Sequence, residues 1–556
     1  MIKIIKDKLH WVLIIFAALY TFWYLPYTFY QQDEWQTLGH NIVLGLSPLL
    51  SINPLYLFFD EVRPLGAVLY IILLGFFKFT VVPSVILAII LHIANGFLTY
   101  YLVIKLTKQR MIALVASLFL ITNSVAHQTV TWVSAVGTLP AITFILAALI
   151  CYFKYIEKSN KKFLFLSFIF TIISIYFKGI GLFLFLLFPL MSIIYADKSV
   201  NLKFVNKILK DNLPLLIFGF LLILVRFSHL FFKSEQVAGF SAGGNSSFLQ
   251  IIGLRSILYP LTSLFQSFIP ARDIYTFTPS ITKMQYKFLA DSPLVDLVAQ
   301  SIVADMVAIL GSILIFCVLG LIVFKSKDKI ITRNIVFALI LFLAVFLPYA
   351  VYDRDSSYLS SRYFYLGLVP AGILLGYIVS YFYNLNKYLK WVVIIIMGVF
   401  FMHHSNVARS DILYQVKLGN ERKAVLNGIK SLQPKLNDKT IFYVTSDKQY
   451  YGPITNPFQN GLGYVLEVWY YDSGKIPKEF LEENFLWDLG AEGYRESNGK
   501  GFGYYQDIDK MVLDMKKNKL NVSLIRAFSL SSSEGKILDI TPTVVSRVST
   551  ISGILK

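Results

Sequence analysis

The chain has 556 residues, of which 56% are hydrophobic and 15% are charged, and its mean hydropathy is +0.62. These values exclude an ordinary soluble globular protein and predict a polytopic membrane protein. The net charge of +18 does not indicate nucleic-acid binding, because most basic residues gather between apolar segments, as the positive-inside rule describes. The two cysteines, Cys151 and Cys317, lie within apolar segments and do not predict a disulfide.

The N-terminal part predicts one membrane span that leads to an acidic outer loop. The segment MIKIIKDKLH and the apolar run after it imitate a signal peptide. No small-residue cleavage site follows, so we expect a retained span at about 10–30. The lysines before it place the N-terminus in the cytoplasm. The span therefore delivers the loop QQDEWQTLGH…FFDEVRPLG to the outer face of the membrane.

The remaining apolar runs predict an all-α membrane domain over residues 1–405, with about eleven spans. Segment 64–80 is short, and counting it as a span would place Lys105, Lys108 and Arg110 outside, so we expect an interfacial or re-entrant helix in the first outer loop. Segment 248–268 is interrupted by Arg255 and Pro260, and we expect it to be an interfacial helix as well. Basic residues in the short loops give all spans one consistent orientation. The ten spans after the first are at about 83–104, 111–125, 138–153, 163–177, 180–195, 213–232, 302–324, 335–351, 364–383 and 391–404.

Residues 406–556 have shorter apolar runs and dispersed charges. The pattern predicts a helix at 411–432 that ends before Pro434, because proline cannot continue a helix. Segments 439–445 and 520–528 are typical of strands, and a helix is expected at 507–518. The sequence thus predicts a small extracytoplasmic α+β domain, with acceptor selection as its hypothetical role.

Two adjacent carboxylates, Asp33 and Glu34, follow the first span. Acids at the mouth of a membrane helix are costly to desolvate and are candidates for function. A positioned carboxylate can remove the proton of an acceptor hydroxyl during nucleophilic attack. We therefore expect a general base here, with Asp33 preferred to Glu34. The alternative is a solvated helix end that marks the interface.

The same outer loop contains Asp60, Glu61 and Arg63. One interpretation is a structural ion-pair cluster. The other is that these residues hold the loop in place or bind a substrate, with Arg63 close to its phosphate. Pro64 favours a helix that starts just after Arg63.

Two further cations lie in predicted outer turns. Lys178 stands between two apolar helices, where the positive-inside rule disfavours it. It either snorkels to the interface or binds an anionic head group. Arg362 opens the aromatic run RYFY, and its planar guanidinium is suited to bidentate phosphate binding.

The second outer loop, 123–137, carries no formal charge. Its His127 and Gln128 are candidates for hydrogen bonds to sugar hydroxyls, and Trp132 for stacking on a sugar face. The alternative for Trp132 is a residue of the interfacial aromatic belt. No motif indicates a metal centre, although a divalent cation bound by Asp33, Glu34 or Asp60 stays open. Neither a P-loop nor a dinucleotide fingerprint is present.

Several segments together resemble the C-type membrane glycosyltransferases that use polyprenyl-phosphate sugars. The chain is similar to protein O-mannosyltransferases and to the lipid A aminoarabinose transferase over about residues 1–405. The best matches are the acids that follow the first span and the RPLG segment. Further similar segments are LHIANGFLTYYLVIKL, TVTWVSAVGTL, IYFKGIGLFLFLLFPL and SSRYFYLGLVPAGILLG.

The resemblance implies that Asp33 is the catalytic base and that the donor is a polyprenyl-phosphate sugar. Lys178 and Arg362 would stabilise its phosphate, and direct displacement would invert the anomeric centre. The acceptor would be a protein, a lipid or a glycan. Many relatives have an acid where this chain has Gly179 and another near Gln128, and the chain departs from the family pattern at both positions. The alternative function is a transporter or flippase for a lipid-linked sugar or small solute.

Overall fold

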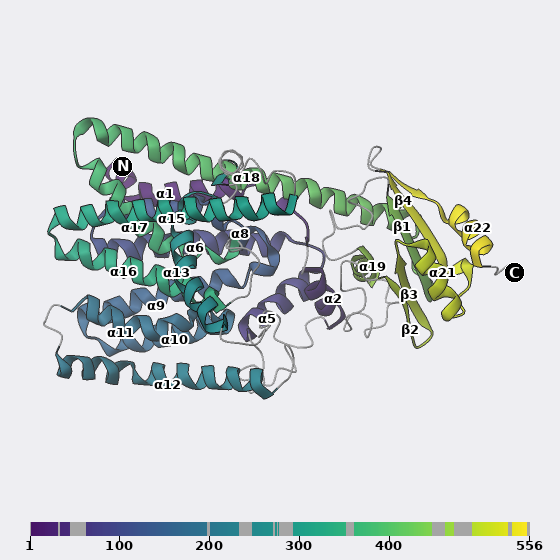
Figure 1. Cartoon of the computed structure of the whole chain (residues 1–556), viewed down its shortest axis with the longest axis horizontal. Helices are drawn as coiled ribbons and strands as arrows, with labels where there is room; N and C mark the ends of the chain where they lie inside the picture. The colour runs from purple at the N-terminus through teal and green to yellow at the C-terminus, as the bar shows by residue number, and fades with distance from the viewer. Residues whose placement is uncertain are drawn as a thin grey trace. The chain divides into compact units, whose positions relative to one another are not determined.

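The computed structural model describes most of the chain (Figure 1). Statements about structure below concern residues 2–31, 34–44, 63–196, 201–232, 247–270, 273–274, 276, 293–351, 361–446, 462–471, 492–531 and 536–552. The chain forms two compact units. The first consists of Met1–Trp23, Asn53–Gly66 and Leu87–Ser410, and the second of Tyr24–Ile52, Ala67–Ile86 and Asp411–Lys556.

Helices account for most of the described residues between 2 and 432. Six of the described helices are long and apolar enough to cross a membrane, and four shorter helices are also apolar. The helices up to residue 196 are α1 (Ile2–Phe22), α2 (Glu34–Leu44), α5 (Pro64–Tyr70), α6 (Val82–Thr107), α7 (Arg110–Thr122), α8 (Gln128–Thr131), α9 (Thr138–Lys158), α10 (Lys161–Phe177) and α11 (Leu184–Ile194). They are followed by α12 (Leu202–Phe232), α13 (Ser247–Phe268), α15 (Pro293–Ser326), α16 (Lys329–Phe346), α17 (Leu368–Tyr383) and α18 (Lys387–Leu432).

The prediction of a mainly helical, apolar region is thus confirmed, whereas the count of about eleven spans stays a prediction, because six described helices meet the criteria for a span. Several helices also differ in extent from the predicted segments. The expected helix at 64–80 forms as α5 and continues as a π-helix, η2 (Ile71–Phe76). Helix α13 covers the expected segment 248–268. The span at 391–404 and the helix at 411–432 are one continuous helix, α18, because no proline or glycine pair interrupts them.

Close helix packing in the first unit depends on small residues. Helix α17 carries Gly372 and Gly376, four residues apart, against α7. A Cβ atom at Gly372 would lie 3.0 Å from the backbone of Ala116, and one at Gly376 would lie 3.0 Å from the carbonyl oxygen of Ile112. This small-xxx-small spacing lets two membrane helices approach closely enough for extensive van der Waals contact.

The C-terminal part of the second unit contains a five-stranded sheet in the order β2-β3-β1-β4-β5. The central strand β1 is parallel to β3 and β4, whereas β2 and β5 are antiparallel edge strands. Asn498 and Gly499, both at positive φ, turn the chain between β2 and β3, as expected for a tight hairpin. The strands are β1 (Lys439–Ser446), β2 (Gly493–Ser497), β3 (Lys500–Tyr505), β4 (Ile525–Ser531) and β5 (Lys536–Asp539).

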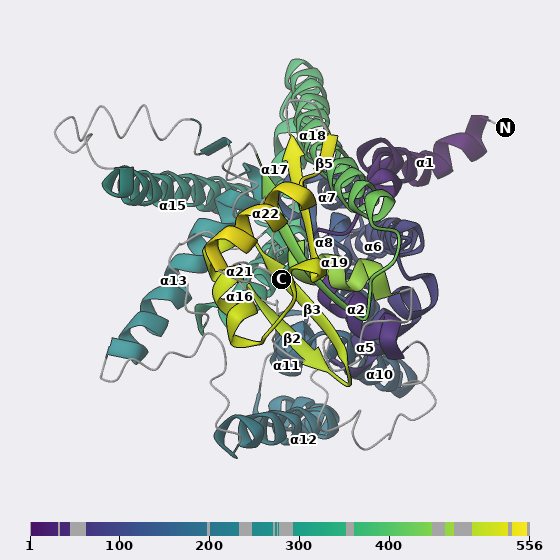
Figure 2. The same cartoon turned by 90° about the vertical axis from the view of Figure 1, so that its right-hand side faces the viewer.

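Helices cover both faces of this sheet. Successive side chains of a strand point to opposite faces, so neighbouring apolar residues of β1 pack against different helices. Ile441 of β1 belongs to an apolar core with Met511 of α21 (Ile508–Lys517) and Val548 of α22 (Thr541–Ser552). These two helices lie in front of the sheet in Figure 2. The next residue of β1, Phe442, stacks on Tyr470 of α19 (Leu462–Tyr470) at 5.8 Å between ring centroids.

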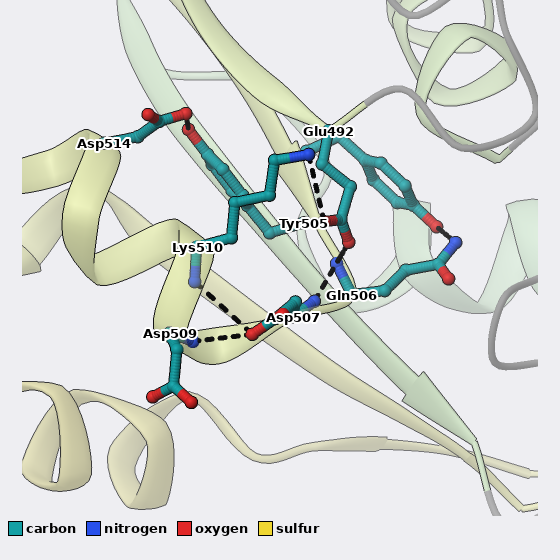
Figure 3. Close-up of polar contacts among 8 residues, drawn as sticks. Glu492, Tyr505, Gln506, Asp507, Asp509, Lys510 and Asp514 are labelled. Atoms are coloured by element: carbon teal, nitrogen blue, oxygen red, sulfur yellow. Dashed lines mark hydrogen bonds and ion pairs between the residues drawn. The ribbon is translucent and has the colours of Figure 1, made fainter.

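The junction between β3 and α21 is a capping arrangement (Figure 3). Asp507 is the N-cap of α21 and accepts backbone hydrogen bonds from Asp509 and Lys510. Glu492 accepts from the backbone N–H groups of Gln506 and Asp507. These contacts satisfy backbone donors at the helix start, so we interpret the junction as structural.

The prediction of a small C-terminal domain with strands and helices is confirmed. Strand β1 and helix α21 agree with the predicted segments, whereas β4 begins at Ile525, five residues later than expected. The second unit begins at Asp411 in this region rather than at residue 406, and it also includes 24–52 and 67–86. Part of the predicted acidic loop therefore belongs to the same compact unit as the sheet.

Candidate functional site

Lys178 occupies a sharp turn that follows helix α10. Its backbone is extended, and Gly179–Phe183 then forms a short 3-10 helix, η5. The Lys178 Nζ atom donates a 2.8 Å hydrogen bond to Oγ1 of Thr138, the first residue of α9. The start of α9 and the end of α10 therefore fix the direction of the ammonium group.

The surroundings of Lys178 disfavour its charged form. Burial is the largest cause, and the positive charges of Arg63 and Arg362 add to it, so that the pKa of Lys178 falls to about 7. Three cations from distant parts of the sequence are thus close enough to influence one another. A cluster of this kind is destabilised by repulsion until an anion neutralises it.

Aromatic rings hold Arg362 beside the lysine. The Arg362 guanidinium lies 4.5 Å from the ring centroid of Trp132 and 5.1 Å from that of Tyr363. The Lys178 Nζ atom lies 5.9 Å from the same Tyr363 ring. Cation–π contacts of this kind position a positive charge without neutralising it.

The second outer loop packs directly against the turn that carries Arg362. Thr129 donates a 3.1 Å hydrogen bond to the Arg362 carbonyl oxygen, and Ser361 donates to the Val125 carbonyl oxygen. The Gln128 backbone N–H donates to Ser361 at 3.5 Å. These contacts explain how an uncharged loop and a cationic turn, more than 200 residues apart, form one site.

The sugar-binding candidates in this loop differ in their surroundings. Trp132 contacts Arg362, and its buried Nε1 atom has no hydrogen-bond partner in the described part of the chain. Gln128 is exposed, whereas His127 is half-buried and its Nδ1 contacts the Ser124 carbonyl oxygen at 2.5 Å. Trp132 is therefore the member of this group placed beside the cations.

Arg63 reaches the cluster from the start of α5. Pro64 is the first residue of that helix, as its fixed φ favours. A Cβ atom at Gly66 would lie 3.2 Å from the Phe177 carbonyl oxygen, and one at Gly137 would lie 3.8 Å from the Gly66 Cα atom. Glycine at 66 thus allows the Arg63 turn to approach the ends of α9 and α10.

The arrangement suits an anion with several oxygens. Two guanidinium groups supply planar pairs of N–H donors, and one ammonium supplies a point charge, which together fit a phosphate. Sequence patterns pointed to Arg63, Lys178 and Arg362, but not to Thr138 or Tyr363. The RYFY run was the only available signal for Tyr363, and an isolated threonine carries none.

Glu34 lies in the second unit, at the start of α2, and its residue is only 1% exposed. Burial and the nearby Glu34 carboxylate both raise the pKa of the Tyr30 hydroxyl. Arg422 of α18, itself buried, also interacts electrostatically with Glu34. A carboxylate compensated by a buried arginine is suited to holding α2 in place.

Glu467 of α19 is a candidate that sequence patterns did not identify. It is fully buried, and neither carboxylate oxygen has a hydrogen-bond partner in the described segments. Burial raises the pKa of Glu467 well above its usual range, against the opposing charge of Arg495. Its position in the apolar segment LGYVLEVWY was the available signal, since an acid there is expensive to bury.

Three predicted site residues, Asp33, Asp60 and Glu61, lie outside the described residues. Among the residues that are described, no group of three or more His, Cys, Asp or Glu side chains could hold a metal ion. The hypothesis of a divalent cation at Asp33, Glu34 or Asp60 therefore stays a prediction. Searches of protein-family profiles and of curated proteins found no match to this chain.

Proposed function

We propose that this protein is an integral membrane glycosyltransferase that moves a sugar from a polyprenyl-phosphate donor to an acceptor hydroxyl. The observation that carries the proposal is that Lys178 and Arg362 share the Tyr363 ring, that Arg362 also contacts Trp132, and that the charge of Arg63 acts on Lys178. Such a site offers positive charge for the phosphate and an aromatic face for the sugar. The resemblance to C-type glycosyltransferases supports the same assignment.

The proposed topology has about eleven spans, a cytoplasmic N-terminus and an extracytoplasmic C-terminal domain in the plasma or inner membrane. Helix α9 has 21 residues, a length of roughly 30 Å, close to the thickness of a bilayer core. Thr138, at its start, holds Lys178 on the proposed outer side. Lys158, at its end, agrees with the expected excess of cations on the inner side.

In the proposed reaction, Asp33 accepts the proton of the acceptor hydroxyl while the hydroxyl oxygen attacks the anomeric carbon. The bond from that carbon to the phosphate oxygen breaks, and its electron pair leaves with the polyprenyl phosphate. The phosphate gains one negative charge in this step. Fixed cations placed where charge develops lower the barrier, and this is the role assigned to Lys178, Arg362 and Arg63.

The lowered pKa of Lys178 is consistent with this role. A buried ammonium between two guanidinium groups is unfavourable in the empty site. Phosphate restores a favourable environment for the charged form, so donor binding and protonation of Lys178 support each other. Glu34 is assigned a structural role because Arg422 already faces it, which leaves Asp33 as the base.

Acceptor selection is assigned to the second unit. This unit contains the start of α2, directly after Asp33, together with α19 and the sheet. Trp35 of α2 contacts Trp469 of α19 with ring centroids 6.5 Å apart. An acceptor bound to the C-terminal part of this unit would thus be linked by direct packing to the segment that carries the proposed base.

The test uses purified protein in lipid nanodiscs and a panel of polyprenyl-phosphate sugars, with release of polyprenyl phosphate followed by mass spectrometry. Turnover of one donor by the wild type, lost in Asp33→Asn and in Lys178→Met, is the expected result. Lys162→Met is the matched control, because Lys162 is an exposed lysine at the opposite end of α10 from Lys178. Movement of an intact donor across the bilayer without cleavage would favour the transporter alternative.

A further inference from the structure

A cavity lies in the helical unit, among the ends of helices that the sequence places on the inner side. Its volume is about 420 Å³, within the range of small-molecule sites. The ends of α6, α9 and α11 contribute to it, together with the starts of α12 and α16. These helix ends lie at the left of Figure 1. Glu157 and Ser159 place the cavity at the end of α9 opposite Thr138, so it is distinct from the Lys178 site.

The charged lining of this cavity is predominantly positive. Among the residues that the structure describes, four cations contribute to it, against the two acids Glu157 and Asp211. Each acid has a partner within the cavity wall: Lys108 pairs with Glu157 at 3.1 Å, and the Tyr155 hydroxyl donates to Asp211 at 2.5 Å. The net charge of the lining is therefore positive. The four cations are Lys105, Lys108, Lys207 and Arg333.

Arg333 is held in place at the cavity wall. Its Nη2 atom donates a 2.6 Å hydrogen bond to the Ala196 carbonyl oxygen at the end of the α11 segment. Lys207 lies on the first turns of α12, where its long side chain reaches the cavity.

The uncharged lining is largely apolar. Leu106, Phe153, Ile156 and Phe204 contribute to it from three helices. A cavity with cations and an adjoining apolar wall matches a molecule with an anionic head and a hydrocarbon body. Basic pockets between membrane helices on the cytoplasmic side are suited to lipid head groups of this kind.

We propose that this cavity binds the phosphate head group of an anionic membrane lipid on the cytoplasmic side. Phosphate oxygens would contact Lys105, Lys207 and Arg333, and the glycerol region would lie against the apolar wall. The lipid would join α6, α9, α11, α12 and α16 at one end of the helical unit. This inference stands on the cavity and its charges and is independent of the glycosyltransferase proposal.

The test is native mass spectrometry of the full-length protein with phosphatidylglycerol or phosphatidylcholine as the probe lipid. The wild type is expected to retain phosphatidylglycerol preferentially. The Lys105→Gln/Lys207→Gln double variant is expected to lose this preference by about fivefold for each cation removed. Lys203→Gln is the matched control, because Lys203 is exposed one turn before Lys207 on α12 and does not line the cavity. This control should retain the lipid as the wild type does.

Arg333→Gln is a separate variant, because it also removes the hydrogen bond to the Ala196 carbonyl oxygen, which the lysine double variant leaves intact. Equal retention of the two lipids by the wild type would overturn the proposal. An equal loss in Lys203→Gln and in the double variant would also overturn it, because the effect would then be one of general surface charge. If millimolar inorganic phosphate displaces the bound lipid and the protein shows no preference between the two lipids, the site binds a soluble anion instead.

Discussion

The ammonium group of Lys178 is fixed 2.8 Å from the hydroxyl oxygen of Thr138. One residue ends the turn after α10 and the other begins α9, so the bond joins two helices at one end of the unit. A lysine that merely snorkels to an interface does not require such a partner. The geometry instead favours a lysine positioned to bind an anion, whose pKa is lowered by burial and, in addition, by two nearby arginines.

Replacement of Thr138 by valine is expected to weaken donor binding. The substitution keeps the shape of the side chain but removes the oxygen that accepts from Lys178. Loss of a hydrogen bond to a charged group corresponds to roughly tenfold in affinity. Binding of a short-chain polyprenyl-phosphate sugar, measured by calorimetry, checks this expectation. Thr138→Ser should restore affinity, and equal affinity in valine and wild-type proteins would contradict a positioning role.

Donor binding is expected to depend on pH through Lys178. In the empty site its pKa is about 7, and the negative donor raises this value in the complex. Above pH 7, binding must therefore take up a proton. The affinity should fall as the pH rises, by up to about tenfold per unit. A phosphodiester donor carries one constant charge over this range, so the titration belongs to the protein.

The matching measurement is the donor dissociation constant between pH 6 and pH 9. A flat profile below pH 7 and a decline above it are expected for the wild type. Lys178→Met should bind weakly with no such decline. A wild-type affinity that increases with pH would be incompatible with the proposed role of the ammonium group.

Replacement of Arg362 by lysine is expected to reduce turnover. Its guanidinium stacks at 4.5 Å on Trp132 and at 5.1 Å on Tyr363. Lysine keeps the charge but loses the planar donors and much of the stacking. We expect Arg362→Lys to reduce turnover by about tenfold. Steady-state release of polyprenyl phosphate measures the effect.

Variants of Trp132 separate stacking from mere bulk at the same position. Trp132→Phe retains an aromatic face for Arg362, whereas Trp132→Leu does not. Activity should therefore decrease in the order wild type, phenylalanine, leucine. If leucine is as active as phenylalanine, the aromatic contact has no part in the reaction.

Glu467 is expected to make stability depend on pH in the acidic to neutral range. Burial raises its folded-state pKa well above the usual value, so the folded protein binds a proton that the unfolded chain releases. Stability should therefore fall as the pH rises above about 4.5, toward the raised pKa. Glu467→Gln, which cannot ionise, should remove this contribution.

Thermal unfolding of purified wild type and Glu467→Gln at pH 5 and pH 8 tests this expectation. The variant should gain stability relative to the wild type at pH 8, and the difference should shrink at pH 5. A constant difference between the two proteins would show that Glu467 does not titrate in this range. Glu496→Gln is a suitable control, because Glu496 lies on the exposed edge strand β2 and pairs with Lys439.

Local sequence patterns predicted much of the helical unit and less of the sheet. Apolar runs such as 335–351 are long enough to identify α16 directly. The edge strands β2 and β5 are only five and four residues long, and their formation depends on pairing with β3 and β4. The sequence predicts two separate helices in the region of α18, because the composition changes along it. In the structure the helix continues from Lys387 to Leu432.

The sequence predicts the cations of the candidate site, but it does not predict the contacts that hold them in place. Lys178 and Arg362 stand out because a charge beside apolar helices is expensive. Their meeting depends on tertiary packing between segments far apart in the chain. Nothing in the local pattern around Thr138 or Gly66 indicates which backbone each will approach. The buried environment of Glu34 likewise depends on Arg422, almost 400 residues away.

The central claim is that this protein cleaves a polyprenyl-phosphate sugar with the help of Lys178. The most direct measurement is release of polyprenyl phosphate from a donor panel in nanodiscs, with candidate acceptors and with or without divalent metal. The account predicts turnover of one donor by the wild type and by Lys162→Met, and none by Lys178→Met or Asp33→Asn. Absence of turnover for every donor, or full turnover by Lys178→Met, would contradict it.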